Sequence, residues 1–320
     1  MQNHIKIFAG NANRPLAEKI AARVGIPLSV ASIGRFPDGE ISVTYEETVR
    51  GRDVFIVQPT GMQPNEFLME LLIMADAARR ASAKRITAVV PFFAYARQDR
   101  KDRSRVPISA KLVANLLVAA GVNRVLTVDL HSPQIQGFFD IPVDHLYAAP
   151  LMVRYLREKL PAENRVVVAP DPGGLKMAYS YSQLLGAGLA LAGKHRTSAT
   201  EVEALELVGD VQGKDCILTD DMTTTAGTLC AAAKLAKDHG AKSVRAVVSH
   251  CPITPLGIQR LKESAIEELI TTDTILPQAG WDGYAITILT VADLLGDAIK
   301  RIYGDESVSK LFEIHQGRTQ

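Results

Sequence analysis

Residues 216–229 read Cys216-Ile-Leu-Thr-Asp-Asp-Met-Thr-Thr-Thr-Ala-Gly-Thr-Leu229. A short apolar run meets two adjacent carboxylates and then a hydroxyl-rich turn that contains a glycine, after which a helix-period segment begins. The pattern predicts a buried strand that passes through a tight turn into a helix. Such strand–turn–helix units are the building blocks of α/β folds.

Short β-branched runs and longer amphipathic segments alternate over the rest of the chain. We predict buried parallel strands at seven runs: 5–8, 54–57, 86–90, 125–128, 166–169, 217–218 and 244–248. Parallel strands need crossover connections, and the predicted helices are 66–81, 109–120, 149–159, 227–239 and 291–302. The predicted fold class is therefore α/β, with central, mostly parallel sheets flanked by helices.

The chain has 320 residues, which fits two domains of ordinary size. The strand–helix pattern occurs twice, and the segment Leu-Tyr-Ala-Ala-Pro at 146–150 is the predicted joint. We expect an N-terminal domain over 1–147 and a C-terminal domain over 148–303. The segment 304–320 is expected to pack back on the first domain.

Composition excludes several classes of protein. The 36 Lys and Arg residues balance 35 Asp and Glu residues, whereas a general nucleic-acid binder carries an excess of positive charge. The three cysteines lack C-x-x-C spacing, which is typical of reduced thiols and not of a disulfide framework. No apolar run approaches the ~18 residues that span a bilayer, and the N-terminus lacks a signal-like apolar segment. We expect a cytoplasmic protein that binds neither nucleic acid nor membranes.

The turn after the twin acids is the strongest candidate for an anion site. A helix N-terminus offers free N–H groups and partial positive charge, and Gly227 permits a close approach to the backbone. The turn also supplies the hydroxyls of Thr224, Thr225 and Thr228. Asp220 and Asp221 are suited to binding a polyol, because carboxylates accept hydrogen bonds from its O–H groups. A threonine N-cap is the alternative for the turn alone, but the paired acids favour a site for a phosphorylated sugar.

The segment 91–105 is the candidate for contact with a nucleotide triphosphate. Neither a P-loop nor a dinucleotide-binding fingerprint occurs, so ATP would be held by other means. Between residues 97 and 105 the sequence contains two carboxylates and five cations, namely Arg97, Arg100, Lys101, Arg103 and Arg105. An ordinary solvated loop and RNA contact are the alternatives for such a charge run.

Further polar residues follow other predicted strands. Asp129 is a suitable ligand for Mg²⁺, a hard cation that prefers oxygen ligands. His131 lies in the same turn but is a less suitable ligand, and the alternative for this residue is a purely structural role. Asp171 either caps a helix or contributes to a metal or sugar site.

The loop at 193–198 carries Lys194 and Arg196 near its tip, between two expected strands. Mobile cationic tips supply charge to phosphoryl-transfer sites when they close. An ordinary solvated turn is the alternative.

Together these segments resemble the ribose-phosphate diphosphokinase family, also called phosphoribosyl pyrophosphate synthetases, in its phosphate-regulated class I form. The matching segments occur in the family's order: 6–10, 35–40, 91–105, 128–144, 170–174, the Lys194/Arg196 loop and 220–228. The resemblance implies two domains of type I phosphoribosyltransferase fold, catalysis at their junction and a homohexamer. The implied reaction moves the diphosphate of MgATP to the 1-hydroxyl of ribose 5-phosphate, giving AMP and phosphoribosyl diphosphate.

The resemblance also implies roles for individual residues. The catalytic cations would be Lys194 and Arg196. The ATP-binding residues would be Phe36, Asp38 and Glu40 of a neighbouring subunit, together with Arg97, Gln98 and His131. The Mg²⁺ site would involve Asp129, His131 and Asp171. Ribose 5-phosphate would be held by Asp220, Asp221, Thr224, Thr225, Ala226, Gly227 and Thr228. Phosphate and ADP, as regulators, would bind near Arg50, Arg105, Ser307 and Ser309.

Two residues depart from the family pattern. Position 224 is Thr where an Asp is common, which removes a carboxylate but keeps a hydrogen-bond donor. Position 133 is Pro, which lacks the backbone N–H that many relatives have near the regulatory site. We expect phosphate binding to persist, and phosphate activation and ADP inhibition to be retained in altered form.

Two alternatives, one an enzyme and one not, stay open at this point. A phosphoribosyltransferase would need no ATP segment, and a non-catalytic regulatory subunit of the same fold would be expected to lose the Lys194/Arg196 loop or the Asp129/His131 pair.

Overall fold

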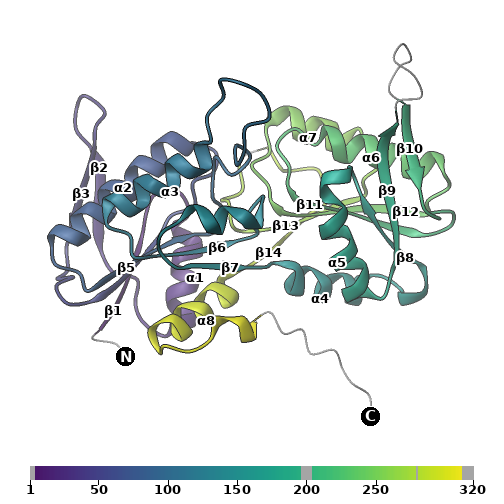
Figure 1. Ribbon diagram of the computed structural model, residues 1–320. Helices are drawn as coiled ribbons and strands as arrows, with labels where there is room; N and C mark the ends of the chain where they lie inside the picture. The colour runs from purple at the N-terminus through teal and green to yellow at the C-terminus, as the bar shows by residue number, and fades with distance from the viewer. Residues whose placement is uncertain (1–3, 196–203, 279, 312–320) are drawn as a thin grey trace. The chain divides into compact units, whose positions relative to one another are not determined.

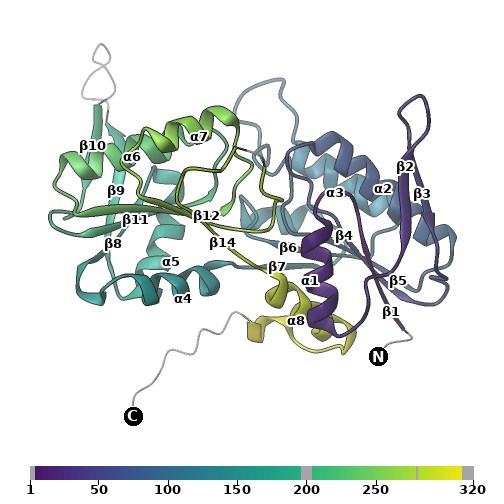
Figure 2. The ribbon, with the colours of Figure 1, turned by 180° about the vertical axis from the view of Figure 1, so that it is seen from behind.

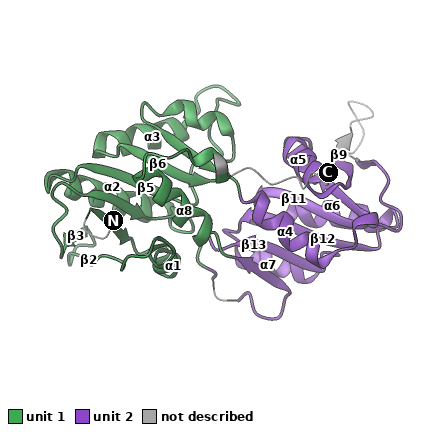
Figure 3. Cartoon of the chain, turned by 90° about the horizontal axis from the view of Figure 1, so that it is seen from below, with its two compact units in different colours: residues 1–147, 274–276, 290–320 green, residues 148–273, 277–289 purple. Residues whose placement is uncertain are grey.

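Apolar strands and amphipathic helices form two α/β units in the computed structural model, which describes residues 4–195, 204–278 and 280–311 (Figure 1). Among these residues, unit 1 contains 4–147, 274–276 and 290–311, and unit 2 contains the remainder (Figure 3). None of the helices in the described ranges is both long and apolar enough to cross a membrane.

Unit 1 is built on a five-stranded parallel sheet with the strand order β1-β4-β5-β6-β7. Its strands are β1 (Ile5–Ala9), β4 (Asp53–Val57), β5 (Arg85–Val90), β6 (Arg124–Val128) and β7 (Val143–Leu146). The helices α2 (Pro64–Arg80) and α3 (Ser109–Ala120) cover one face, and α1 (Arg14–Val24) and α8 (Ala292–Tyr303) cover the other (Figures 1 and 2). An antiparallel ribbon of β2 (Ala31–Arg35) and β3 (Ile41–Tyr45) completes the unit, with the 3₁₀ turns η1 (Pro133–Phe138) and η4 (Val308–Leu311).

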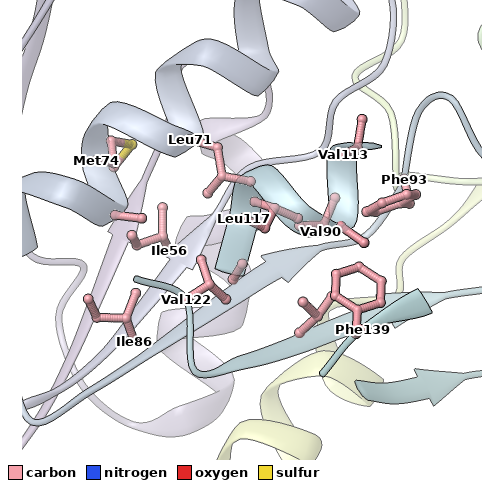
Figure 4. Close-up of a cluster of buried hydrophobic side chains, with 14 of the residues drawn as sticks. Ile56, Leu71, Met74, Ile86, Val90, Phe93, Val113, Leu117, Val122 and Phe139 are labelled. Carbon is pink, nitrogen blue, oxygen red and sulfur yellow. The ribbon is translucent and has the colours of Figure 1, made fainter. Parts of the chain in front are cut away.

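The core of unit 1 lies between this sheet and the helix pair α2 and α3. Apolar residues of these helices recur at helical spacing and meet alternate residues of the strands, as period 3.6 and period 2 require. Figure 4 shows the packed side chains of Ile56, Leu71, Met74, Ile86, Val90, Phe93, Val113, Leu117, Val122 and Phe139. This core fixes the sheet edge from which the polar loops emerge.

Unit 2 is built on a seven-stranded sheet with the order β10-β9-β8-β11-β12-β13-β14, parallel except for the β9–β10 pair. Its strands are β8 (Arg165–Ala169), β9 (Gly188–His195), β10 (Ala204–Val208), β11 (Asp215–Met222), β12 (Ser243–His250), β13 (Glu268–Thr272) and β14 (Ile286–Leu289). The helices α6 (Gly227–Asp238) and α7 (Pro255–Lys262) cover one face, and α4 (Ala149–Lys159) and α5 (Leu175–Leu185) the other (Figures 1 and 2). The 3₁₀ turns are η2 (Ala162–Asn164) and η3 (Pro172–Gly174).

The structure confirms the α/β class and the predicted parallel strands. The placement of α8 differs from the expected boundary at 303, because α8 lies in unit 1 against α1. A side chain at Gly296 would place its Cβ 2.6 Å from Cγ of Arg23, so glycine is needed for this close approach. Arg23 also makes a two-pronged contact with Asp297, at 2.9 Å from Nε and 2.7 Å from Nη2.

Candidate active site

The turn between β11 and α6 forms a cradle of free backbone donors. The N–H groups of residues 224–228 donate to no acceptor within the described part of the chain. Ala226 adopts a left-handed conformation, with φ +53°, at the N-cap of α6. Left-handed residues beside a helix N-terminus turn successive N–H groups toward one point, an arrangement that binds anions. We name residues 224–228 the phosphate turn, after the anion that the sequence predicts for it.

The hydroxyls of the phosphate turn differ in exposure. Thr225 and Thr228 are exposed, whereas Thr224 is half-buried and its Oγ1 has no hydrogen-bond partner in the structure. A buried polar atom without a partner is unfavourable unless a ligand or water satisfies it. Position 224 therefore keeps a hydroxyl that the described protein atoms leave unsatisfied.

Helix α7 holds the phosphate turn from behind. The N–H and the Oγ1 of Thr254 donate to the carbonyl of Thr224 at 2.9 and 3.2 Å. A Cβ on Gly257 would lie 2.8 Å from that same carbonyl oxygen, so only glycine permits this approach. Arg260 donates from Nη1 to the carbonyl of Thr225 at 3.2 Å.

Two carboxylates stand at the carboxyl end of β11, directly before the turn. The N–H of Asp221 donates to Oδ1 of Asp220 at 2.9 Å. Burial first, and then the charge of Asp221, raise the pKa of the Asp220 carboxyl well above its usual range, with a smaller contribution from Asp171. Asp171 itself follows β8 and caps η3, accepting from the N–H of Gly174 at 3.1 Å. Three acids thus lie together beside the phosphate turn.

In unit 1, Asp129 and His131 share the turn after β6. Asp129 is buried, with 6% exposure, and has φ +37°, an unusual backbone conformation for aspartate. Its N–H donates to the carbonyl of Leu146 at 2.9 Å, and burial together with the charge of Asp129 raises the pKa of Tyr147. His131 is exposed.

A buried histidine supports the Asp129 turn. The N–H of Leu130 donates to Nε2 of His145 at 2.9 Å, and Gln136 approaches Nδ1 of the same ring at 3.3 Å. His145 is 6% exposed and its ring lies 4.5 Å from that of Tyr147. The imidazole therefore satisfies a buried amide between Asp129 and His131.

The segment after β5 carries the candidate ATP residues. Thr60 fixes its start, accepting from the N–H of Ala94 at 2.8 Å. Gln98 is tied to the first turn of α3, because its Oε1 accepts from Ser109 and its carbonyl accepts from the N–H of Ala110 at 3.2 Å. Arg97 is exposed and, with the four cations that follow it up to residue 105, makes no ion pair within the described residues.

The tip of the β2–β3 ribbon carries Phe36, Asp38 and Glu40. Two backbone hydrogen bonds close a tight turn at this tip. The N–H of Gly39 donates to the carbonyl of Phe36 at 2.9 Å, and the N–H of Phe36 donates to the carbonyl of Glu40 at 2.8 Å. Phe36 is 54% exposed, which is unusual for a phenylalanine. Arg35 pairs with Glu66 of α2 and fixes the ribbon at that point.

The candidate regulatory residues all belong to unit 1. The hydroxyls of Ser307 and Ser309 lie 2.6 Å apart, and Arg301 donates to the carbonyl of Ser307 at 3.2 Å. Arg50 and Arg105 are exposed, and no described contact joins either to these serines. The structure therefore places the serines together without assembling a complete anion site.

The structure covers the candidate catalytic loop only in part. The backbone of Lys194 belongs to β9 and pairs with Leu205 of β10, so the prediction that the loop begins at residue 193 is wrong: the strand continues to His195 because its backbone pairs with β10. Arg196 lies outside the described residues. The two strands that the sequence predicts on either side of this loop are β9 and β10.

Sequence reasoning missed three residues at these sites: His145, Gly257 and Arg260. Each acts through a contact that is distant in sequence, 15 residues for His145 and 35 for Arg260. The N-cap pattern Thr254-Pro255 before an apolar stretch was a signal that could have located α7. No local pattern connects Arg260 to the phosphate turn.

The residues present fit a magnesium ion that takes only part of its ligands from the protein. No group of three or more His, Cys, Asp or Glu side chains in the described ranges forms a ready metal cage. Mg²⁺ does not require such a cage, because it is often bound by one or two carboxylates together with substrate phosphates and water. The buried Asp129 supplies one such carboxylate.

Comparison with known proteins shows similarity to ribose-phosphate pyrophosphokinases. Residues 5–121 match a model described as the N-terminal domain of ribose phosphate pyrophosphokinase, and residues 195–313 match the phosphoribosyl synthetase-associated domain. A ribose-phosphate pyrophosphokinase of Marinomonas sp. is 50% identical over 311 residues, which cover 96% of this chain and 98% of the relative. Another from Brucella melitensis is 50% identical over 310 residues, 97% of this chain and 100% of the relative.

A solved structure shows the same similarity in three dimensions. The crystal structure of phosphoribosylpyrophosphate synthetase from Mycobacterium smegmatis matches with a TM-score of 0.90 and 42% sequence identity. The match covers 95% of this chain and 100% of that chain.

Proposed function

The chain belongs to the ribose-phosphate pyrophosphokinase family and is an enzyme of that activity, and on this premise we propose how its residues bind the substrates and carry the reaction. The diphosphate of ATP passes to the 1-hydroxyl of ribose 5-phosphate, and the products are AMP and 5-phosphoribosyl 1-diphosphate. These roles rest mainly on the phosphate turn. Its N–H groups have no acceptor within the described residues, and the turn follows the acids Asp220 and Asp221 directly in the chain.

The 5-phosphate of the sugar binds the phosphate turn. The free N–H groups of residues 224–228 and the positive end of α6 offer donors and charge to an anion. The hydroxyls of Thr224, Thr225 and Thr228 add donors around it. Asp220 and Asp221 accept hydrogen bonds from the hydroxyl groups of the ribose. A fully ionised phosphate has no such O–H donors, so these carboxylates contact the sugar ring and not its phosphate.

The nucleotide binds residues of unit 1. Arg97 and Gln98 contact ATP, and the absence of ion pairs in the described 97–105 segment leaves its cations available for phosphates. Phe36, Asp38 and Glu40 of a neighbouring subunit contact the adenine, for which the exposed ring of Phe36 is suited.

Asp129 and His131 of unit 1 would hold Mg²⁺, and Asp171 of unit 2 would contact a metal ion or the sugar. The ion, when bound, neutralises negative charge on the phosphates of ATP. The buried turn of Asp129, fixed by the amide contact to His145, orients the carboxylate before the ion arrives.

In the chemical step, the 1-hydroxyl oxygen bonds to the β-phosphorus. The bond between the β-phosphorus and the oxygen that bridges it to the α-phosphorus breaks, that oxygen leaves with AMP, and the hydroxyl proton is released. Lys194 and Arg196 stabilise the charge that develops on the transferred group. Positioning and charge neutralisation therefore supply most of the rate enhancement.

An assay of products tests this function. The purified protein is incubated with MgATP and ribose 5-phosphate, and nucleotides are separated over time. AMP and phosphoribosyl diphosphate in equal amounts are expected. Formation of ADP with a bisphosphorylated sugar would indicate an ordinary kinase, and no turnover would favour a regulatory subunit.

The protein assembles as a homohexamer and responds to phosphate and ADP through Arg50, Arg105, Ser307 and Ser309. The exposed ribbon tip supports the assembly, because Phe36 needs a partner surface to become buried. Light scattering measures the assembly, and activity that stays constant from phosphate-free to phosphate-rich buffer would reject the regulatory role.

A further inference from the structure

We propose that Arg260 of α7 is a further binding residue for the 5-phosphate of the sugar substrate. This inference rests on the proposed function and adds a residue to its phosphate site. Arg260 lies outside the phosphate turn in sequence and belongs to a different helix, so no motif around residues 220–228 predicts its participation.

The guanidinium of Arg260 lies directly beside the phosphate turn. Its Nη1 donates to the carbonyl of Thr225 at 3.2 Å. The same nitrogen lies 3.3 Å from the position that a Cβ on Gly227 would occupy. The cation therefore lies next to the backbone of residues 225–227, whose N–H groups have no acceptor within the described residues.

Arg260 and the N-terminus of α6 bring two sources of positive charge to the phosphate turn. The N-terminus of α6 carries partial positive charge, and the first turn of α6 contains no acidic residue. Arg260 has no ion-pair partner within the described residues. A cation beside the positive end of a helix is unfavourable in isolation, and a bound anion removes that cost.

Arg260 differs from two other exposed helix cations in the kind of polar partner that it has. Arg80 pairs with Asp76 at 2.6 Å, and Lys234 pairs with Asp238 at 2.5 Å. These exposed cations have carboxylates one turn away, whereas the polar partner of Arg260 is the carbonyl of the phosphate turn. Arg260 thus joins the phosphate turn to a free positive charge.

The donor inventory of arginine suits this double role. A guanidinium has five N–H donors in a planar fork, and the contact to Thr225 uses one of them. The remaining donors can bind two oxygens of a phosphate while the first still holds the carbonyl. Lysine, with a compact ammonium group, reproduces the charge but not the planar fork.

The experiment measures the affinity of ribose 5-phosphate by calorimetry for the full-length protein and for Arg260→Gln, Arg260→Lys and Lys262→Gln, each at several salt concentrations. Lys262 is the matched control, because it is the other cation in the last turn of α7 and contacts the carbonyl of Asp282. Thermal unfolding shows whether each variant is folded. If Arg260→Gln does not fold, the comparison is made with Arg260→Lys instead.

Loss of a charged hydrogen bond predicts that Arg260→Gln weakens binding about tenfold or more. Arg260→Lys should weaken binding less, and Lys262→Gln should leave it within about twofold of the wild type. The affinity of Arg260→Gln should also depend less steeply on salt, because one charge pair with the phosphate is gone.

Two results would overturn the inference. Unchanged affinity in Arg260→Gln would remove Arg260 from the site. Weaker affinity with an unchanged salt dependence would show that Arg260 only holds the backbone of the turn. If the wild-type protein itself failed to bind ribose 5-phosphate, the proposed function would fail instead, which keeps the two claims distinguishable.

Discussion

At the scale of single residues, the ionised form of Asp220 is destabilised in the folded protein. The side chain is half-buried at the end of β11, and burial together with Asp221 and Asp171 raises its pKa. An aspartate in an unfolded chain titrates near ~3.9. The folded protein therefore holds a proton on Asp220 at pH values where the unfolded chain has released it.

This difference predicts a change in stability with pH. Asp220 contributes stability below its unfolded pKa, and that contribution is lost as the pH rises through the folded pKa. Asp220→Asn should therefore raise the midpoint of thermal unfolding at pH 8 by roughly 2–4 °C for each kcal/mol relieved, with little change at pH 4. The same variant should weaken ribose 5-phosphate binding roughly 10–100-fold.

Calorimetric scans of both proteins at the two pH values, followed by ligand titration, check this expectation. An equal unfolding midpoint for Asp220→Asn and wild type at pH 8 would show that the ionised Asp220 carboxylate does not destabilise the folded protein.

The buried imidazole of His145 offers a second test at this scale. Its Nε2 accepts the N–H of Leu130, and His145→Leu would leave that buried donor unsatisfied at a cost of about 1–3 kcal/mol. His145→Gln keeps an acceptor and should recover part of this loss. His239→Gln is a matched control, since His239 is exposed at the end of α6. Urea unfolding measures the differences, and equal losses for the Leu and Gln variants would argue against the hydrogen bond.

At the scale of secondary-structure elements, α7 shapes the phosphate turn. Its N-terminal residues approach the carbonyl of Thr224, and Gly257 makes this approach possible. A Cβ at this position would lie 2.5 Å from Cγ1 of Ile253 and 2.8 Å from that carbonyl. Either the helix or the turn must move to accept it.

We expect Gly257→Ala to lower stability by about 1–3 kcal/mol, as overpacking does, and to weaken ribose 5-phosphate binding. Gly34→Ala is the control, because a Cβ at Gly34 meets only Ser42 Oγ at an ordinary 3.5 Å. Chemical denaturation and ligand titration are measured for both variants. Wild-type affinity in Gly257→Ala would mean that α7 does not position the turn.

The elements that the sequence predicts best are those with a clear apolar period. The predicted ranges of α3 and α4 agree with the structure, and the strand predicted at 217–218 is the centre of β11. Helix α7 has only eight residues, and β2 and β3 are partly exposed, so none of them has a strong periodic signal. The phosphate turn could be found in the sequence because its parts are contiguous, whereas Arg260 and His145 depend on contacts made by the tertiary fold.

At the scale of the whole molecule, the chain passes from unit 1 to unit 2 and then returns. Helix α8 follows the last strand of unit 2 in sequence but packs on α1 of unit 1. Its apolar face buries Leu295, Ile299 and Ile302. Sequence order alone suggested that α8 belongs to the second domain, because a helix after a strand usually covers the same sheet.

This topology predicts where a substitution in α8 acts. Ile299→Ala should destabilise unit 1 by about 2–5 kcal/mol, since Ile299 is fully buried. Ile288→Ala, at a position of β14 that is 39% exposed, should cost less than about 1 kcal/mol. Hydrogen exchange should accelerate in α1 for Ile299→Ala and stay unchanged in unit 2. Faster exchange in unit 2 with α1 protected would contradict the assignment of α8.

We propose that residues 224–228 bind the phosphate of ribose 5-phosphate. The most direct measurement is a crystal structure of the full-length protein with ribose 5-phosphate. We expect phosphate oxygens within about 2.7–3.2 Å of the backbone nitrogens of the turn, with the ribose hydroxyls on Asp220 and Asp221. A sugar phosphate bound elsewhere, with these nitrogens facing only solvent, would contradict the account.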